Sequence, residues 1–165
     1  IDAAGLPFLQ GLTPPAGSKS VEELKQIVSW AQRPFILKGI MTARGAEKAL
    51  EAGASGIVVS NHGGRVLDHC PATAEVLPEI VDAVGGKMTI FVDGAIRSGM
   101  DMFKALALGA DAVLIGRPFV TTVYGGGEEG VQLYVQKLKA ELADTMRMCG
   151  AHSLAEIKRS MLFGF

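Results

Sequence analysis

The sequence predicts an α/β fold in which four parallel strands alternate with helices, enough for half of an eightfold (β/α)8 barrel. Apolar strand-like runs alternate with helix-like segments over residues 20–124, the pattern of a parallel sheet covered by helices. The run Ala49–Ser60 also matches Ala105–Gly116 without a gap, at an offset of 56 residues. Two βαβ pairs therefore share one template.

The first two strand-like runs are each preceded or followed by a helix with a clear start signal. Ser20 and Glu23 have the spacing of a capping box, and Thr42 is placed to cap a second helix that Gly53 ends. The second strand is an uninterrupted apolar run, as expected for a strand buried on both faces. These signals predict a helix over 21–31, a strand over 35–38, a helix over 43–52 and a strand over 56–60.

The second half repeats the alternation and then becomes helical. Gly85 and Gly86 stop one helix, Ser98 caps the next, and Gly109 closes it. The expected order is a helix over 73–84, a strand over 89–92, a helix over 99–108 and a strand over 112–115. A short turn after Pro118, a break at 125–127, a long helix over 128–148 and a last helix capped by Ser153 with Glu156 complete the chain.

Composition limits the class of partner. The 165 residues are 48% apolar with 21 glycines, and 16 basic against 17 acidic residues leave a net charge of −1. This balance argues against nucleic acid or an anionic membrane as a partner of the whole surface. No apolar run approaches the length of a membrane span, and a signal pattern is lacking, so we expect a cytoplasmic protein. Cys70 and Cys149 lack metal-ligand spacing and predict reduced thiols and no metal site.

The repeat places four residues at equivalent strand ends: Lys38, Ser60, Asp93 or its neighbour Gly94, and Gly116. In a (β/α)8 barrel this is the face where chemistry takes place. Lys38 ends an otherwise apolar strand, which is an unusual place for a cation unless it faces an anion or an active site. The alternative is a strand-end lysine that extends to solvent.

The run Ser60-Asn61-His62-Gly63-Gly64-Arg65 follows the second strand and carries an acid-base group beside a fixed cation. An imidazole titrates near neutrality, so His62 can accept a proton, and a guanidinium can hold a carboxylate through two parallel hydrogen bonds. The run is therefore equipped to bind an acid and take a proton from its α-carbon. The alternative is an ordinary turn with a solvated Arg65.

Two Gly/Arg turns follow the third and fourth strands: residues 93–98, with Gly94 and Arg97, and residues 116–118, with Gly116 and Arg117. Adjacent turns of this kind commonly hold a phosphate through backbone N–H groups, helix N-termini and arginines. The alternative is that the glycines only make turns and that both arginines are solvated.

Together these motifs resemble those of the FMN-dependent α-hydroxy acid oxidases and dehydrogenases, such as glycolate oxidase, lactate oxidase and mandelate dehydrogenase. The resemblance is carried by residues 37–40, 60–65 with 67–68, 93–97, and 104–110 running on to 116–118. It implies a TIM barrel with FMN that oxidises a small (S)-2-hydroxy acid to a 2-keto acid. Ala95 departs from the family pattern, which usually has a second glycine there.

The resemblance also implies roles for residues of this chain. His62 would be the base, Arg65 would bind the substrate carboxylate, and Lys38 would lie beside the N1/C2 carbonyl edge of the flavin. Asp93 would bind the ribityl chain or orient His62. The remaining expected cofactor-binding residues are Ser60 and Gly63 at the flavin, and Gly94, Arg97, Gly116 and Arg117 at the phosphate.

The family's barrel has eight strands, and the resemblance covers the last four. It divides the chain into a loop remnant (1–19), four βα units (20–124) and C-terminal helices (125–165). Because the chain starts at Ile1 and not Met, we expect a longer protein in which the other half of the barrel comes from the same chain or a second copy, with a homo-oligomer expected. Oxygen or another acceptor would take the electrons. Two alternatives stay open: another phosphate-binding barrel, of the isopentenyl-diphosphate isomerase or inosine monophosphate dehydrogenase kind, or a non-catalytic half-barrel.

Overall fold

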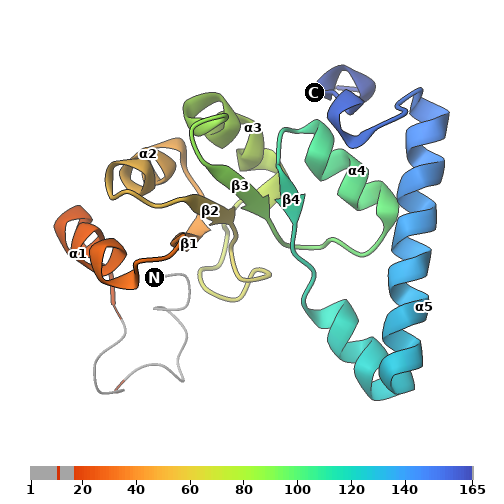
Figure 1. Cartoon of the computed structure of the whole chain (residues 1–165), viewed down its shortest axis with the longest axis horizontal. Helices are drawn as coiled ribbons and strands as arrows, with labels where there is room; N and C mark the ends of the chain where they lie inside the picture. The colour runs from red at the N-terminus through yellow and green to blue at the C-terminus, as the bar shows by residue number, and fades with distance from the viewer. Residues whose placement is uncertain (1–10, 12–16, 165) are drawn as a thin grey trace.

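The computed structural model describes Gly11 and residues 17–164, so most of the predicted loop over 1–19 lies outside the described residues. Helices and strands alternate in chain order (Figure 1). The helices are α1 Val21–Ala31, α2 Ala43–Glu51, α3 Thr73–Val84, α4 Gly99–Ala107 and α5 Arg117–Cys149, and the strands are β1 Ile36–Ile40, β2 Gly56–Val59, β3 Thr89–Val92 and β4 Ala112–Val113. Each predicted βα unit is present.

The four strands form one parallel sheet in the order β1-β2-β3-β4. Leu37 pairs with Ile57, Ile57 with Ile90, and Val92 with Val113. Every strand is therefore the neighbour of the next one in the chain, which is the arrangement of a barrel wall. Helices α1 to α4 form an arc along one side of the strands (Figure 1).

Apolar side chains between the sheet and the helices make the main core. Ile57 of β2 and Ile80 of α3 are fully buried, and all four residues of β2 are buried, as its uninterrupted apolar run predicts. Thr42 and Ser98 cap α2 and α4 through their hydroxyl groups, and Ser20 forms the predicted capping box. The caps and the core together fix where each strand ends.

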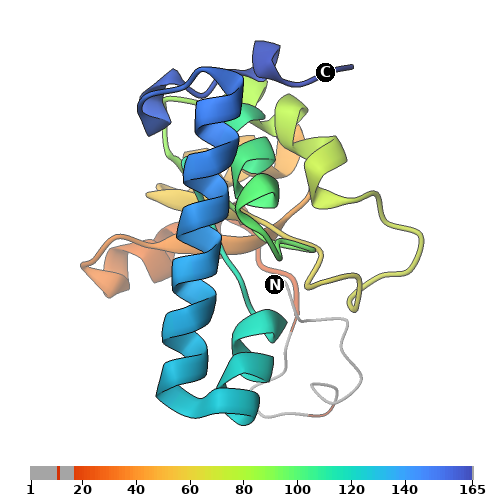
Figure 2. The same cartoon turned by 90° about the vertical axis from the view of Figure 1, so that its right-hand side faces the viewer.

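The long helix α5 crosses the end of this layer and packs beside α4, as Figure 2 shows. It is kinked at Gly127, whose φ of 53° and ψ of −137° are not helical, so the predicted break over 125–127 is confirmed. The segment before the break is helical from Arg117 onward and not merely a short turn. None of the helices in the described part of the chain has both the length and the apolar character needed to cross a membrane.

Three predicted elements need correction. The first strand is Ile36–Ile40 and not 35–38, because Gly39, at a φ of 92°, forms a bulge that lets the pairing continue. The fourth strand stops at Val113 and not at residue 115, since Val113 pairs with Val92, the last residue of β3.

The predicted last helix is in fact two 3₁₀ turns, Leu154–Glu156 and Arg159–Met161. Ser153 does contact Glu156, with 3.1 Å between the hydroxyl and the carboxylate. The backbone nevertheless becomes extended at Ile157, which is buried in a second apolar cluster with Phe103 of α4. Burial of that side chain ends the helix after one turn.

Candidate functional site

Three strand ends bring polar side chains together at one edge of the sheet. Lys38 lies in β1, Ser60 follows β2, and Asp93 follows β3. The Lys38 ammonium donates to the Ser60 hydroxyl at 2.9 Å and lies 3.4 Å from Asp93 Oδ2. The side chains at the strand ends that the repeat aligns are therefore in contact. Lys38 faces an anion, which excludes the alternative of a lysine that only extends to solvent.

Asp93 has one carboxylate oxygen that is not used. Its Oδ1 atom is buried and has no hydrogen-bond partner among the described residues, while its backbone carbonyl accepts a hydrogen bond from Thr73 at 2.6 Å. A buried carboxylate oxygen without a donor carries a free-energy cost. A ligand with hydroxyl groups could supply that donor.

The loop after β2 carries His62 in a constrained backbone conformation. His62 has a φ of 55°, and Gly63 and Gly64 continue the left-handed run at 67° and 77°. The Ser60 hydroxyl accepts a hydrogen bond from the His62 N–H at 3.1 Å, and Arg65 Nε donates to the His62 carbonyl at 3.2 Å. A histidine in this backbone region is uncommon, and such strain is typical of functional sites. The same turn therefore fixes both candidate substrate residues.

Arg117 reaches back to this loop from the start of α5. Its Nη2 atom is 3.4 Å from the Gly63 carbonyl oxygen, and a Cβ at position 63 would lie 2.5 Å from the same nitrogen. Gly63 suits its left-handed backbone conformation, and with a Cβ at this position the end of the Arg117 side chain would have to move. The second Gly/Arg turn and the histidine loop form one site.

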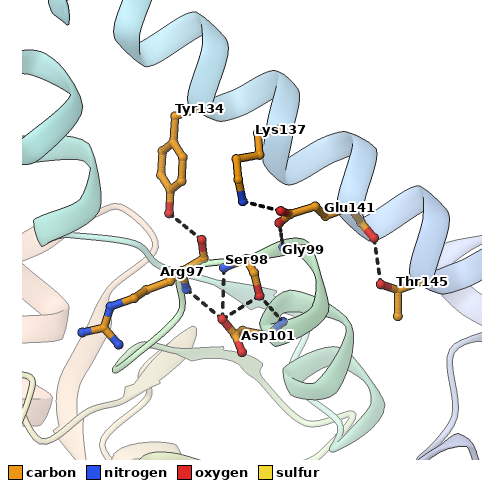
Figure 3. A network of polar contacts seen from close by, with 8 residues as sticks. All are labelled: Arg97, Ser98, Gly99, Asp101, Tyr134, Lys137, Glu141 and Thr145. Atoms are coloured by element: carbon orange, nitrogen blue, oxygen red, sulfur yellow. Dashed lines mark hydrogen bonds and ion pairs between the residues drawn. The ribbon is translucent and has the colours of Figure 1, made fainter. Parts of the chain in front are cut away.

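The turn that carries Arg97 is held by carboxylates (Figure 3). Asp101 accepts hydrogen bonds from the Arg97 N–H at 3.0 Å, from the Ser98 N–H at 3.0 Å and from the Ser98 hydroxyl at 2.8 Å. Burial alone would raise the pKa of Asp101, but these hydrogen bonds outweigh it and lower the pKa. Glu141 of α5 accepts from the Gly99 N–H at 2.9 Å.

Because of these contacts, the N-termini of α4 and α5 differ in their ability to bind an anion. The first turn of α4 is occupied by the carboxylates of Asp101 and Glu141, which would repel a bound anion. The N-terminus of α5 begins at Gly116 and has no side-chain cap. An anion between the two turns would therefore meet the N–H groups of α5 and the side chains of Arg97 and Arg117.

The strand ends, the histidine loop and the two arginine turns border one cavity of about 690 Å³, within the usual range for a ligand site. Nine of the ten predicted site residues line it: Lys38, His62, Gly63, Arg65, Asp93, Gly94, Arg97, Gly116 and Arg117. The tenth, Ser60, is buried directly behind Lys38. The lining also includes Thr121, Thr122 and Tyr134 of α5, which the sequence analysis did not single out. Tyr134 follows Arg97 by 37 positions in an ordinary amphipathic helix, and no local signal links the two.

Comparison with known proteins places this arrangement among flavin-dependent oxidoreductases. The model of the family described as FMN-dependent dehydrogenase matches residues 11–163. A peroxisomal (S)-2-hydroxy-acid oxidase of Oryza sativa subsp. japonica is 48% identical over 149 residues, which cover 90% of this chain and 40% of the rice protein. An L-lactate oxidase of Roseobacter sp. (strain GAI101) is 43% identical over 146 residues, covering 88% of this chain and 40% of the relative.

Solved structures give the same result for the fold. The crystal structure of mandelate oxidase with (S)-2-phenylpropionate matches with a TM-score of 0.83 and 43% sequence identity. The match covers 88% of this chain and 43% of the mandelate oxidase chain. The chain therefore spans about two fifths of the length of the curated and solved relatives described here.

Proposed function

The chain belongs to the FMN-dependent dehydrogenase family, and on that premise we propose that the complete polypeptide oxidises a small (S)-2-hydroxy acid to the 2-keto acid. One observation carries the proposal. A single cavity gathers an imidazole, a guanidinium beside it, a lysine at a strand end and two further arginines at adjacent turns. The relatives, which are named as (S)-2-hydroxy-acid, L-lactate and mandelate oxidases, support this substrate class.

The residues of the cavity fit FMN, the cofactor of this family. The buried Asp93 Oδ1 atom, which has no partner in the part of the chain that the structure describes, would accept a hydrogen bond from a ribityl hydroxyl. Arg97 and Arg117, with the uncapped N-terminus of α5 at Gly116, would hold the phosphate. Gly94 lies beside them with a φ of 98°, a backbone conformation that glycine adopts readily. Ala95, at a φ of 59°, takes the same unusual conformation with a methyl group and lines the cavity.

Lys38 would lie beside the flavin ring. Ser60 and Asp93 anchor its ammonium group, so its positive charge would be available to stabilise negative charge on the ring. Ser60 also holds the His62 N–H and thereby couples the lysine to the histidine loop. Gly63 would line the flavin site beside Arg117.

The substrate would bind between the flavin and the loop after β2. Arg65 would hold its carboxylate through a bidentate pair, and His62 would take one of the two protons that the hydroxy acid loses. When bound, FMN would supply the acceptor for the two electrons and the other proton. The Arg65 Nε contact to the His62 carbonyl keeps the two residues in a fixed relation, so the carboxylate and the α-carbon are presented together.

The complete barrel and the final electron acceptor are part of the same proposal. Strands β1 and β4 each pair with one neighbour among the described strands, and paired edges are the stable state of a barrel. We propose that the rest of the polypeptide, or a second copy in a homo-oligomer, completes it. The names of the relatives favour oxygen as the acceptor. A cytoplasmic location stays a prediction, and the rice relative is named as peroxisomal.

Anaerobic titration of the complete polypeptide with glycolate, (S)-lactate and (S)-mandelate tests the proposal. We expect bound flavin, loss of its visible absorption with at least one of these acids, and one 2-keto acid formed per flavin reduced. A bound flavin that none of the acids reduces would favour another FMN barrel. Material that binds no flavin would instead favour a non-catalytic half-barrel.

A further inference from the structure

Tyr134 of α5 contacts the Arg97 turn and also Phe119, the residue that directly follows the turn over 116–118. Its hydroxyl donates to the Arg97 carbonyl at 3.0 Å. Its ring meets Phe119 edge to face, with the ring centroids 5.1 Å apart and the planes at 72°. Phe119 is two residues beyond Arg117 in the first turns of α5. One side chain therefore connects the main chain at Arg97 to the helix that begins at Arg117.

The main chain of Arg97 is held on both sides. Asp101 accepts from its N–H group, and Tyr134 donates to its carbonyl (Figure 3). The Arg97 side chain itself extends away from Tyr134 and Lys137 in this view. The ordinary pKa of a tyrosine already keeps its hydroxyl protonated, and therefore a donor, at neutral pH, and burial raises the pKa of Tyr134 further. The main chain that carries the guanidinium is therefore held by contacts that do not involve the guanidinium.

A second contact, a hydrogen bond between α4 and α5, fixes the position of α5 along α4. Glu141 accepts from the Gly99 N–H and pairs with Lys137 on its own helix (Figure 3). Gly99 is buried, and a Cβ there would lie 2.5 Å from the Leu138 carbonyl oxygen. The two helices meet backbone to backbone, so the position of Tyr134 relative to the Arg97 turn is fixed.

From these contacts we propose that Tyr134 is a positioning residue that sets the separation of the two arginine turns, and through it the affinity for the phosphate of FMN. The inference rests on the proposed placement of that phosphate between Arg97 and Arg117. Two guanidinium groups can bind one phosphate strongly only when their spacing matches it. Loss of the Tyr134 hydroxyl leaves the Arg97 carbonyl without its donor and lets the turn move.

The test compares Tyr134→Phe with Tyr124→Phe in the complete polypeptide. These are the two tyrosines of the chain, and Tyr124 is 90% exposed on the same helix. Each flavin-free protein is titrated with FMN and with riboflavin, which lacks the phosphate, and quenching of flavin fluorescence gives the dissociation constants. We expect Tyr134→Phe to weaken FMN binding about 3- to 10-fold, the effect of one hydrogen bond. Riboflavin binding should be unchanged, and Tyr124→Phe should bind both ligands normally.

Equal FMN affinity in the two variants would overturn the inference. A parallel weakening of FMN and riboflavin by Tyr134→Phe would also overturn it, because it would show a general structural role. Arg97→Ala, measured alongside, separates this failure from failure of the proposed function. If Arg97→Ala weakens FMN binding and Tyr134→Phe does not, only the positioning role is wrong. If Arg97→Ala has no effect, the phosphate placement itself is wrong.

Discussion

Replacing Gly99 with Ala probes the contact that holds α5 beside the Arg97 turn. The added Cβ would lie 2.5 Å from the Leu138 carbonyl oxygen and 2.6 Å from the Glu141 carbonyl carbon, and closer still to the Leu142 nitrogen. Ordinary contacts begin at 3.4 Å, so α5 would have to retreat by about 1 Å.

The cost of this change has two parts. Overpacking against a rigid backbone costs about 1–3 kcal/mol. Movement of α5 also stretches the 2.9 Å hydrogen bond from the Gly99 N–H to Glu141, which adds about 1 kcal/mol. We therefore expect Gly99→Ala to lower the free energy of unfolding by about 2–4 kcal/mol.

Urea unfolding of the complete polypeptide, followed by circular dichroism, measures this loss. Gly126→Ala is the matched control, since its Cβ would meet no heavy atom within 4 Å and the residue lies in α5. We expect the control to be unchanged or up to about 1 kcal/mol more stable, because alanine favours a helix. Equal stability of the two variants would refute the claim that α5 and α4 are locked at Gly99.

Three further outcomes follow from the site. Arg97→Ala and Arg117→Ala should each weaken FMN binding by about 1–3 kcal/mol, and unchanged dissociation constants in flavin titrations of both would contradict the phosphate placement. Arg65→Lys should raise KM and lower kcat together, because an ammonium cannot form the bidentate pair; steady-state kinetics that match the unaltered protein would refute its role. The lowered pKa of Asp101 adds stability above about pH 4 that is lost as the pH falls through its folded value, so Asp101→Asn should reduce the acid dependence of thermal unfolding, and an unaltered pH profile would count against this.

The local signals of the sequence were sufficient for most of the fold. The bounds of α3 and β3 agree with the prediction residue for residue, because Gly85 ends the helix and the strand is a short apolar run between clear breaks. The prediction of a last helix was wrong because tertiary burial of Ile157 overrides a good capping signal at Ser153. The bulge at Gly39 also depends on the neighbouring strand, which no local pattern describes.

The residues of the site also include some that the sequence predicts and some that it does not. Residues at strand ends could be found because the 56-residue repeat aligns them, and Lys38, Ser60 and Asp93 are indeed in contact. The sequence could not identify Tyr134 of α5 as part of the site, because Tyr134 reaches the Arg97 turn only through the packing of two helices. The roles of the individual side chains stay predictions until they are tested.

The most direct test of the central claim is the rate at which a hydroxy acid reduces the bound flavin of His62→Gln, followed by anaerobic stopped flow. The variant should bind FMN normally, since the phosphate contacts lie on other loops, and its rate of flavin reduction should fall by about 10²–10⁴-fold, the usual loss for a general base. A His62→Gln protein that is reduced at nearly the rate of the unaltered protein would contradict the account.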